Sequence, residues 1–99
     1  MIQDHTQHIG VMTVSVHIPH AQSLKEKRHV LRSLKDHVRN KFNVSMAQLD
    51  GEDKWQTALL GFCMINRDQR HINSALENLN SFLHGFPGME ICDTAIEFY

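Results

Sequence analysis

The chain is poor in cysteine, proline and tryptophan, and it contains no long hydrophobic run. Two cysteines without a paired spacing do not build a disulfide framework, and Cys63 and Cys92 lie in apolar, strand-like segments, so we expect reduced and buried thiols. The longest apolar run, residues 58–65, is far shorter than the roughly 20 residues that span a bilayer. Residues 1–8 lack the basic and apolar regions of a secretion signal. We therefore expect a cytoplasmic protein.

Catalytic and cofactor signatures are also missing. The sequence has no P-loop and no G-x-G-x-x-G, G-x-S-x-G or H-E-x-x-H motif. Acylphosphatases carry a glycine-rich loop with an arginine after their first strand, whereas residues 18–23 here read Ile-Pro-His-Ala-Gln-Ser. These absences favour a non-enzymatic protein without a cofactor.

Eight histidines raise the question of a metal site. His5 with His8 and His17 with His20 give two H-x-x-H spacings, but the first pair lies near the chain end and the second flanks Pro19. A structural zinc site needs four ligands, commonly including cysteine, and hydrogen-bonded groups that orient them. We expect no metal site.

Hydrophobic periodicity predicts a strand followed by a helix in the first part of the chain. Apolar residues alternate along residues 9–18, which is typical of a half-buried strand, and Pro19 ends it. Ser23 with Glu26 three residues later forms a capping box for a helix that runs to about residue 41. The apolar stripe of this helix consists of Leu24, Leu31, Leu34 and Val38.

The second part of the chain repeats this order after a hairpin. Residues 43–49 predict a short strand, and the acidic segment 50–54 predicts a solvated turn. Residues 55–65 are apolar on both faces, which indicates a central strand. Asp68 caps a second helix, and residues 89–98 form the last strand. The apolar stripe of the second helix consists of Ile72, Leu76, Leu79 and Leu83.

The order βαββαβ is the ferredoxin-like, split βαβ pattern, an α+β fold with two helices on one face of a four-stranded antiparallel sheet. We expect residues 9–99 to form a single domain of this kind, preceded by a flexible extension of residues 1–8. The pattern leaves the other sheet face uncovered. Because the central strand is apolar on both sides, we expect a ligand or a second subunit rather than solvent alone on that face.

The cationic residues are concentrated in the first helix. Seven of the ten lysines and arginines lie between residues 25 and 41, and this segment carries a net charge of +5, whereas the rest of the chain carries −6. At helical spacing four of them form one stripe, called the cationic stripe below: Arg28, Arg32, Lys35 and Arg39. Lys25 lies at its margin, and Lys27 lies near the apolar stripe, where its stem can pack. Such a patch attracts phosphates or an acidic surface.

The motifs SLKEKR at residues 23–28, VLRSL at 30–34, FNVSMAQLD at 42–50 and WQTALLG at 55–61 resemble the bacterial YlxP-like family, a domain of unknown function. The resemblance covers nearly the whole chain from residue 9. It implies a ferredoxin-like fold, no established activity and, from the translation and ribosome-maturation genes near the family's genes, an RNA context. Met46 and Gln48 depart from the pattern, which has valine and an acidic residue there, and so does the histidine-bearing extension.

Charge segregation and the family context favour a non-enzymatic RNA- or ribosome-associated protein. The cationic stripe contacts phosphates in this hypothesis, with Lys25 and Lys27 assisting. Trp55 is a candidate for base stacking, although a tryptophan there more often packs over the sheet rim. Stacking of bases on the sheet, as in RNA-recognition domains, is disfavoured because the first strand has no aromatic residue.

Two alternatives use other properties of the chain. In the first, the open sheet face forms a homodimer and creates a small-ligand pocket, in a regulatory module. In the second, the basic helix docks an acidic protein surface, so that the chain is an adaptor. The sequence does not decide between them and RNA binding.

Overall fold

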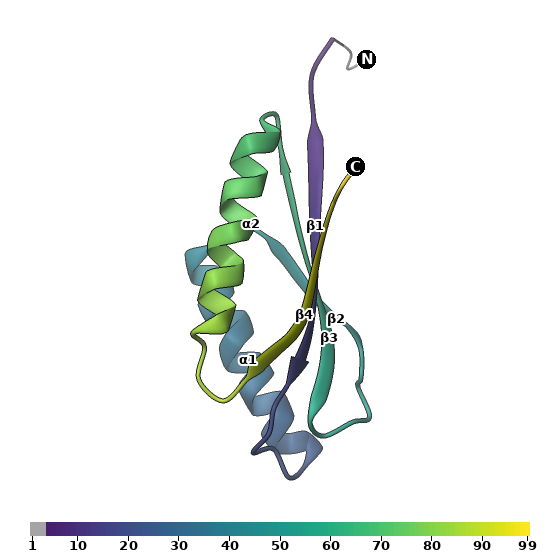
Figure 1. Cartoon of the computed structure of the whole chain (residues 1–99), viewed down its shortest axis with the longest axis vertical. Coiled ribbons are helices and arrows are strands. Elements are labelled where there is room, and N and C mark those ends of the chain that lie inside the picture. The colour runs from purple at the N-terminus through teal and green to yellow at the C-terminus, as the bar shows by residue number, and fades with distance from the viewer. Residues whose placement is uncertain (1–3) are drawn as a thin grey trace.

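The computed structural model describes residues 4–99, which form six elements in the order strand, helix, strand, strand, helix, strand (Figure 1). Their bounds are β1 His8–His17, α1 Leu24–Lys41, β2 Ser45–Asp50, β3 Thr57–Asn66, α2 Gln69–His84 and β4 Glu90–Phe98. The predicted order is confirmed. Among the described residues no helix is long and apolar enough to cross a membrane.

The four strands form one antiparallel sheet in the order β2-β3-β1-β4. The two strands that supply most of the buried sheet residues, β1 and β3, lie at the centre of the sheet. Both helices pack on the same side of the sheet, and its other face is open (Figure 1). This is the ferredoxin-like fold that the sequence predicts.

The core lies between the sheet and the two helices, and alternation along the strands decides which residues enter it. The even-numbered residues of β1 and β3 face the helices and are buried: Met12, Val14, Val16, Ala58, Leu60, Phe62 and Met64. The odd-numbered side chains of β3, including Leu59 and Cys63, consequently lie on the open face. The sequence left this orientation undecided.

The second helix packs tightly on the sheet because β1 offers it a glycine. A Cβ atom at Gly10 would collide with Ile72 of α2, and it would lie 3.1 Å from a Leu76 methyl group. Ile72 and Leu76 are fully buried, with Leu79 and Leu83 one and two turns further on. The predicted apolar stripe of this helix is therefore its packing face.

Two expectations about β3 and β4 were wrong in detail. The third strand begins at Thr57, so Trp55 lies before it in the hairpin segment. Both cysteines are free, but Cys63 is only half-buried and Cys92 is exposed. The pairing of β4 with β1 shifts between Ser15 and Val16, so Cys92 is an extra residue in a bulge and escapes the alternation that would have buried it.

Candidate functional site

The first helix is fixed at its start by the residues that the sequence marks as a cap. Ser23 has an extended backbone, and its hydroxyl accepts a hydrogen bond from the Glu26 N–H at 3.1 Å. The Glu26 carboxylate reaches back to the N–H of Gln22, one residue earlier than in the usual reciprocal box. Because both bonds join the loop to the first turn, the rotation of α1 about its axis, and hence the direction of its faces, is set from Ser23 onward.

The two faces of α1 have opposite chemistry. Its buried residues are Lys27, Leu31, Leu34 and Val38, and the cationic stripe follows each of them by one position and is exposed. In residues 4–99 the ion pairs are His17 with Glu90 and Arg70 with Asp68, so none of the stripe's charges has a carboxylate partner. Four neighbouring cations form a positive face on α1, and Asp36 lies four positions after Arg32 and three before Arg39.

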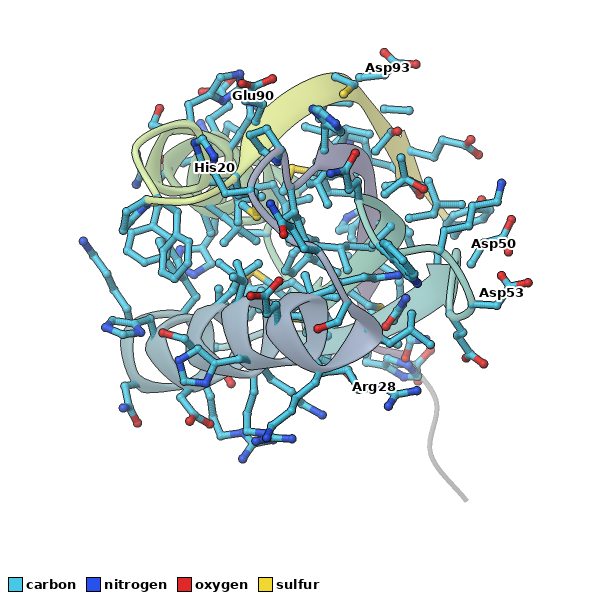
Figure 2. All side chains as sticks on the ribbon, turned by 90° about the horizontal axis from the view of Figure 1, so that it is seen from below. His20, Arg28, Asp50, Asp53, Glu90 and Asp93 are labelled. Carbon is cyan, nitrogen blue, oxygen red and sulfur yellow. The ribbon has the colours of Figure 1, made fainter. Side chains whose placement is uncertain are left out.

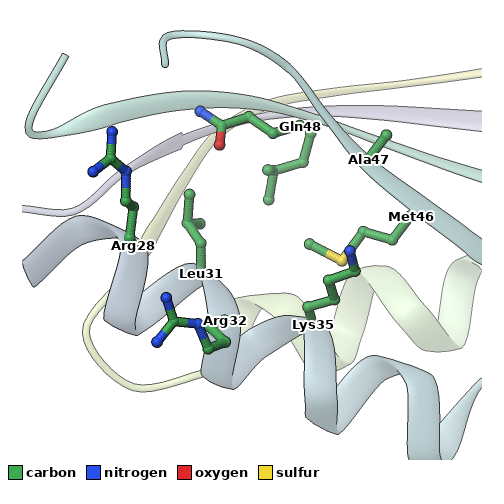
Figure 3. Close-up of a pocket in the computed structure, with 8 residues that line it drawn as sticks. Arg28, Leu31, Arg32, Lys35, Met46, Ala47 and Gln48 are labelled. Atoms are coloured by element: carbon green, nitrogen blue, oxygen red, sulfur yellow. The ribbon is translucent and has the colours of Figure 1, made fainter. Parts of the chain in front are cut away.

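The stripe lines a groove between α1 and the edge strand β2. A cavity of about 320 Å³ is lined by Arg28, Arg32 and Lys35 from the helix and by Met46, Ala47 and Gln48 from β2, with Leu31 and Leu60 between them (Figure 3). An adjoining cavity of about 280 Å³ continues past Lys35 and Met46 to Arg39, Val44 and Ser45. We call the two together the α1–β2 groove. No acidic residue lines it.

The wall opposite the helix is formed by β2 and offers uncharged hydrogen-bonding groups. Because β2 is an edge strand that pairs only with β3, its outer N–H and C=O groups have no neighbouring strand to bond. Gln48, which pairs with Leu60 and so lies on the helix side of β2, adds an amide to this wall. The groove thus has a cationic wall, an apolar floor and a wall of hydrogen-bonding groups.

Lys27 does not take part in this surface. It is only 1% exposed, and its ammonium donates to the carbonyl oxygens of Gly51 and of Lys54, the latter at 2.6 Å. Burial lowers the pKa of Lys27 from its usual value of 10.5, although the carboxylates of Asp53 and Glu52 oppose the shift. Lys27 therefore ties α1 to the hairpin loop, and we leave it out of the set that contacts a ligand.

The remaining cations of α1 point away from the groove. Lys25 lines a different cavity, beside His20 and His29 at the start of the helix. Lys41 lies over the ring of Phe82 on α2, with 5.0 Å from its nitrogen to the ring centre. The groove is thus served by the cationic stripe alone.

Trp55 is 55% exposed in the hairpin segment and is not among the residues that line the groove. The structure therefore does not bring it together with the cationic stripe. Its ring remains available to solvent at the end of the hairpin, where base stacking stays a prediction.

Most acidic residues lie elsewhere on the molecule. Asp50 is the last residue of β2, Asp53 lies in the hairpin loop, and Glu90 and Asp93 lie on β4, at the sheet edge opposite β2 (Figure 2). Among residues 4–99 no group of three His, Cys, Asp or Glu side chains is placed to hold a metal ion. The separation of charge in space is only partial, because Glu26 and Asp36 lie on α1 itself and Asp53 and Glu52 lie close enough to affect the pKa of Lys27.

Sequence reasoning missed the β2 half of the groove. Alternation within residues 43–49 indicates that Met46 and Gln48 share one face, but it does not say which helix lies beside that face. Position 48 was noticed only because the YlxP-like pattern has an acidic residue there. An acid at this position would lie in the groove with the stripe, and the glutamine leaves the groove without a negative charge.

Known proteins match this chain over nearly its whole length. Residues 9–96 match the model of a family described as "Protein of unknown function (DUF503)". The chain is also 33% identical over 91 residues to the "Uncharacterized protein YlxP" of Bacillus subtilis (strain 168), and the match covers 92% of this chain and 99% of that protein. Both helices and the α1–β2 groove lie inside the matched region.

Proposed function

We propose a function from the geometry of the chain itself, because the chain belongs to this protein family of unknown function and its relatives therefore suggest no activity. In this proposal the chain is a cytoplasmic, non-enzymatic protein that binds RNA, free or in a ribosomal particle. Phosphates contact the cationic stripe, and Lys25, which lies outside the groove at the start of the helix, adds only long-range attraction.

The observation that carries this proposal is the cationic stripe without partners. Side chains three and four positions apart on a helix are neighbours, so like charges there repel one another. Arg28, Arg32 and Lys35 nevertheless lie together, with no carboxylate in the groove that they line. A polyanion removes this repulsion, and each phosphate contact adds salt-dependent affinity without base specificity.

The test is a salt titration of binding to a fluorescently labelled, structured fragment of ribosomal RNA, measured by anisotropy. About four phosphate contacts give a slope of log affinity against log salt of roughly −3 to −4, with the coefficient known for duplex DNA. A variant with all four stripe residues changed to Glu loses binding by at least about 100-fold, because attraction becomes repulsion.

The chain offers a matched control for the change in net charge. Four other exposed cations, Lys41, Lys54, Arg67 and Arg70, can be changed to Glu in a second variant of identical net charge. This control retains most of the wild-type affinity if the stripe is the site. An equal loss of affinity in both variants would mean that the stripe acts only through the net charge of the protein. Wild-type affinity in the stripe variant would refute the proposal. Capture of acidic proteins that survives nuclease treatment would favour the adaptor alternative instead.

Self-association through the open sheet face is a second candidate property. Val11 of β1 and Leu59 and Cys63 of β3 lie in the centre of that face, half-buried and uncharged. Leu49 bends over Gly61, so that its side chain, 54% exposed, extends the apolar surface across β2. A second copy brings the same apolar centre, while the carboxylates of Glu97 and Asp93, which pair with Val11 and Ser15, lie at the β4 side of the face. Sedimentation as a monomer at micromolar concentration would refute this, and Leu59→Glu should dissociate the dimer without changing the stripe.

A further inference from the structure

The shape of the α1–β2 groove distinguishes between two forms of RNA. An RNA duplex presents its phosphates on a convex cylinder and keeps its bases paired inside, so it touches only the rims of a groove. An unpaired strand exposes ribose and base faces as well as phosphates. Only the second form has both kinds of surface that the groove offers, a row of cations and an apolar floor.

The floor has the dimensions and the chemistry for such a strand. Its two cavities, of about 320 and 280 Å³, share the lining residues Lys35 and Met46 and so follow one another along the helix. Leu31 and Met46 supply apolar surface, and Met46 is a flexible, polarisable side chain that adapts to different ring shapes. This floor selects for an exposed apolar face rather than for a particular base.

The walls match the backbone of the strand. The cationic stripe follows the spacing i, i+4, i+7, i+11, which places the Cβ atoms of neighbouring stripe residues about 5–6 Å apart along the groove. Successive phosphates of an extended strand have a similar separation, so that each cation can meet one phosphate. On the other wall Gln48 and the free edge of β2 can bond ribose hydroxyls or base edges.

We propose that the α1–β2 groove binds an unpaired RNA strand of about four nucleotides, without base specificity. The phosphates lie against the cationic stripe, and riboses or bases lie over Met46 and Leu31. This inference rests on the proposed function, because it names the form of RNA that the same stripe binds.

The experiment compares wild-type binding to three labelled RNAs: an unstructured oligouridine of twelve nucleotides, a blunt twelve-base-pair duplex, and that duplex with a four-nucleotide overhang. We expect the oligouridine and the overhang to bind at least about tenfold more tightly than the blunt duplex. The salt slope for the oligouridine should be about −2.8, from four contacts at the coefficient for single strands.

Two groove variants leave the stripe intact. Met46→Ala shortens the floor, so it should weaken oligouridine binding several-fold without changing the salt slope, because no charge is removed. Gln48→Glu places a negative charge in the groove and should weaken the same binding at low salt. Its control is Gln69→Glu, the same chemical change at an exposed position at the start of α2, and this variant should bind as wild type. Circular dichroism of each variant shows that the fold is kept.

The outcomes separate this inference from the proposed function. Equal or tighter binding of the blunt duplex, with Met46→Ala and Gln48→Glu binding as wild type, would overturn the strand assignment and leave phosphate contact by the stripe intact. Binding that does not respond to reversal of the stripe would overturn the proposed function and, with it, this inference. An acidic peptide that displaces the oligouridine at equal charge would overturn both by assigning the groove to a protein segment.

Discussion

The two helices have the same spacing of buried residues, but they differ in the residue types at these positions and on the exposed stripe beside them. The buried residues of α1 are 27, 31, 34 and 38, and those of α2 are 72, 76, 79 and 83, so both follow i, i+4, i+7, i+11. Lys27 occupies the position in α1 that Ile72 occupies in α2. The positions that carry the cationic stripe in α1 hold Asn73, Glu77, Asn80 and His84 in α2. The comparison teaches that α2 is built for packing, whereas α1 combines packing with a tether and a charged face.

We expect the largest loss of stability from the removal of apolar volume from α2. Leu76 is fully buried against the sheet, where Gly10 lets the helix approach closely. Leu76→Ala should lower the free energy of unfolding by about 2–5 kcal/mol, through lost burial and the cavity that remains. Urea denaturation measures this loss. RNA affinity of the folded fraction should not change, and a parallel loss of affinity would mean that the two helices are coupled.

The tether of α1 should be the next most sensitive feature. Lys27→Met keeps most of the stem but leaves the carbonyl oxygens of Gly51 and Lys54 without their donor. We expect a loss of about 1–3 kcal/mol in unfolding free energy, and a larger loss for Lys27→Ala, which also opens a cavity. Hydrogen exchange should accelerate in the hairpin segment 50–56 and remain slow in α2. A Met variant as stable as wild type would show that the tether is dispensable.

The pH dependence of stability isolates the same lysine. Burial holds the pKa of Lys27 below 10.5 in the folded protein, so the unfolded chain keeps its proton to higher pH. Between the lowered pKa and 10.5 the unfolded state binds more protons, and stability therefore rises with pH in this window. The difference in unfolding free energy between wild type and Lys27→Met should move in favour of wild type from neutral pH toward 10.5. A constant difference would contradict a lowered pKa.

How much of this was visible in the sequence depends on whether a feature is local. The caps of both helices and the apolar stripe of α2 follow from residues within one or two turns, and they were predicted. In α1 the predicted Leu31, Leu34 and Val38 are buried, whereas Leu24 is only half-buried and Lys27 completes the buried face. Lys27 was expected near the apolar stripe, but its two acceptors lie 24 and 27 positions away, which no periodicity encodes. The same holds for the groove, because Met46 and Arg32 meet only through the sheet order. A bulge also exposes Cys92, whose place in an apolar, strand-like segment had predicted a buried thiol.

The smallest expected effect on stability comes from the cationic stripe of α1. Arg32 is flanked by Arg28 at i−4 and Lys35 at i+3, and by Asp36 at i+4. Two like-charge pairs, each destabilising a helix by about 0.2–0.5 kcal/mol, therefore outweigh one opposite-charge pair of similar size. At the matched position of α2, Glu77 instead accepts a hydrogen bond from Asn73 at 3.2 Å. Arg32→Gln should therefore leave the unfolding free energy unchanged or raise it by a few tenths of a kcal/mol, whereas Glu77→Ala should lower it by a similar amount. Precise urea denaturation at low salt can resolve differences of opposite sign.

If Arg32→Gln destabilised the protein by more than about 1 kcal/mol, which is beyond what an ordinary surface substitution costs, the arginine would be holding the fold together. If Arg32→Gln instead made the protein more stable and weakened its RNA binding, the stripe would serve a partner and not the fold.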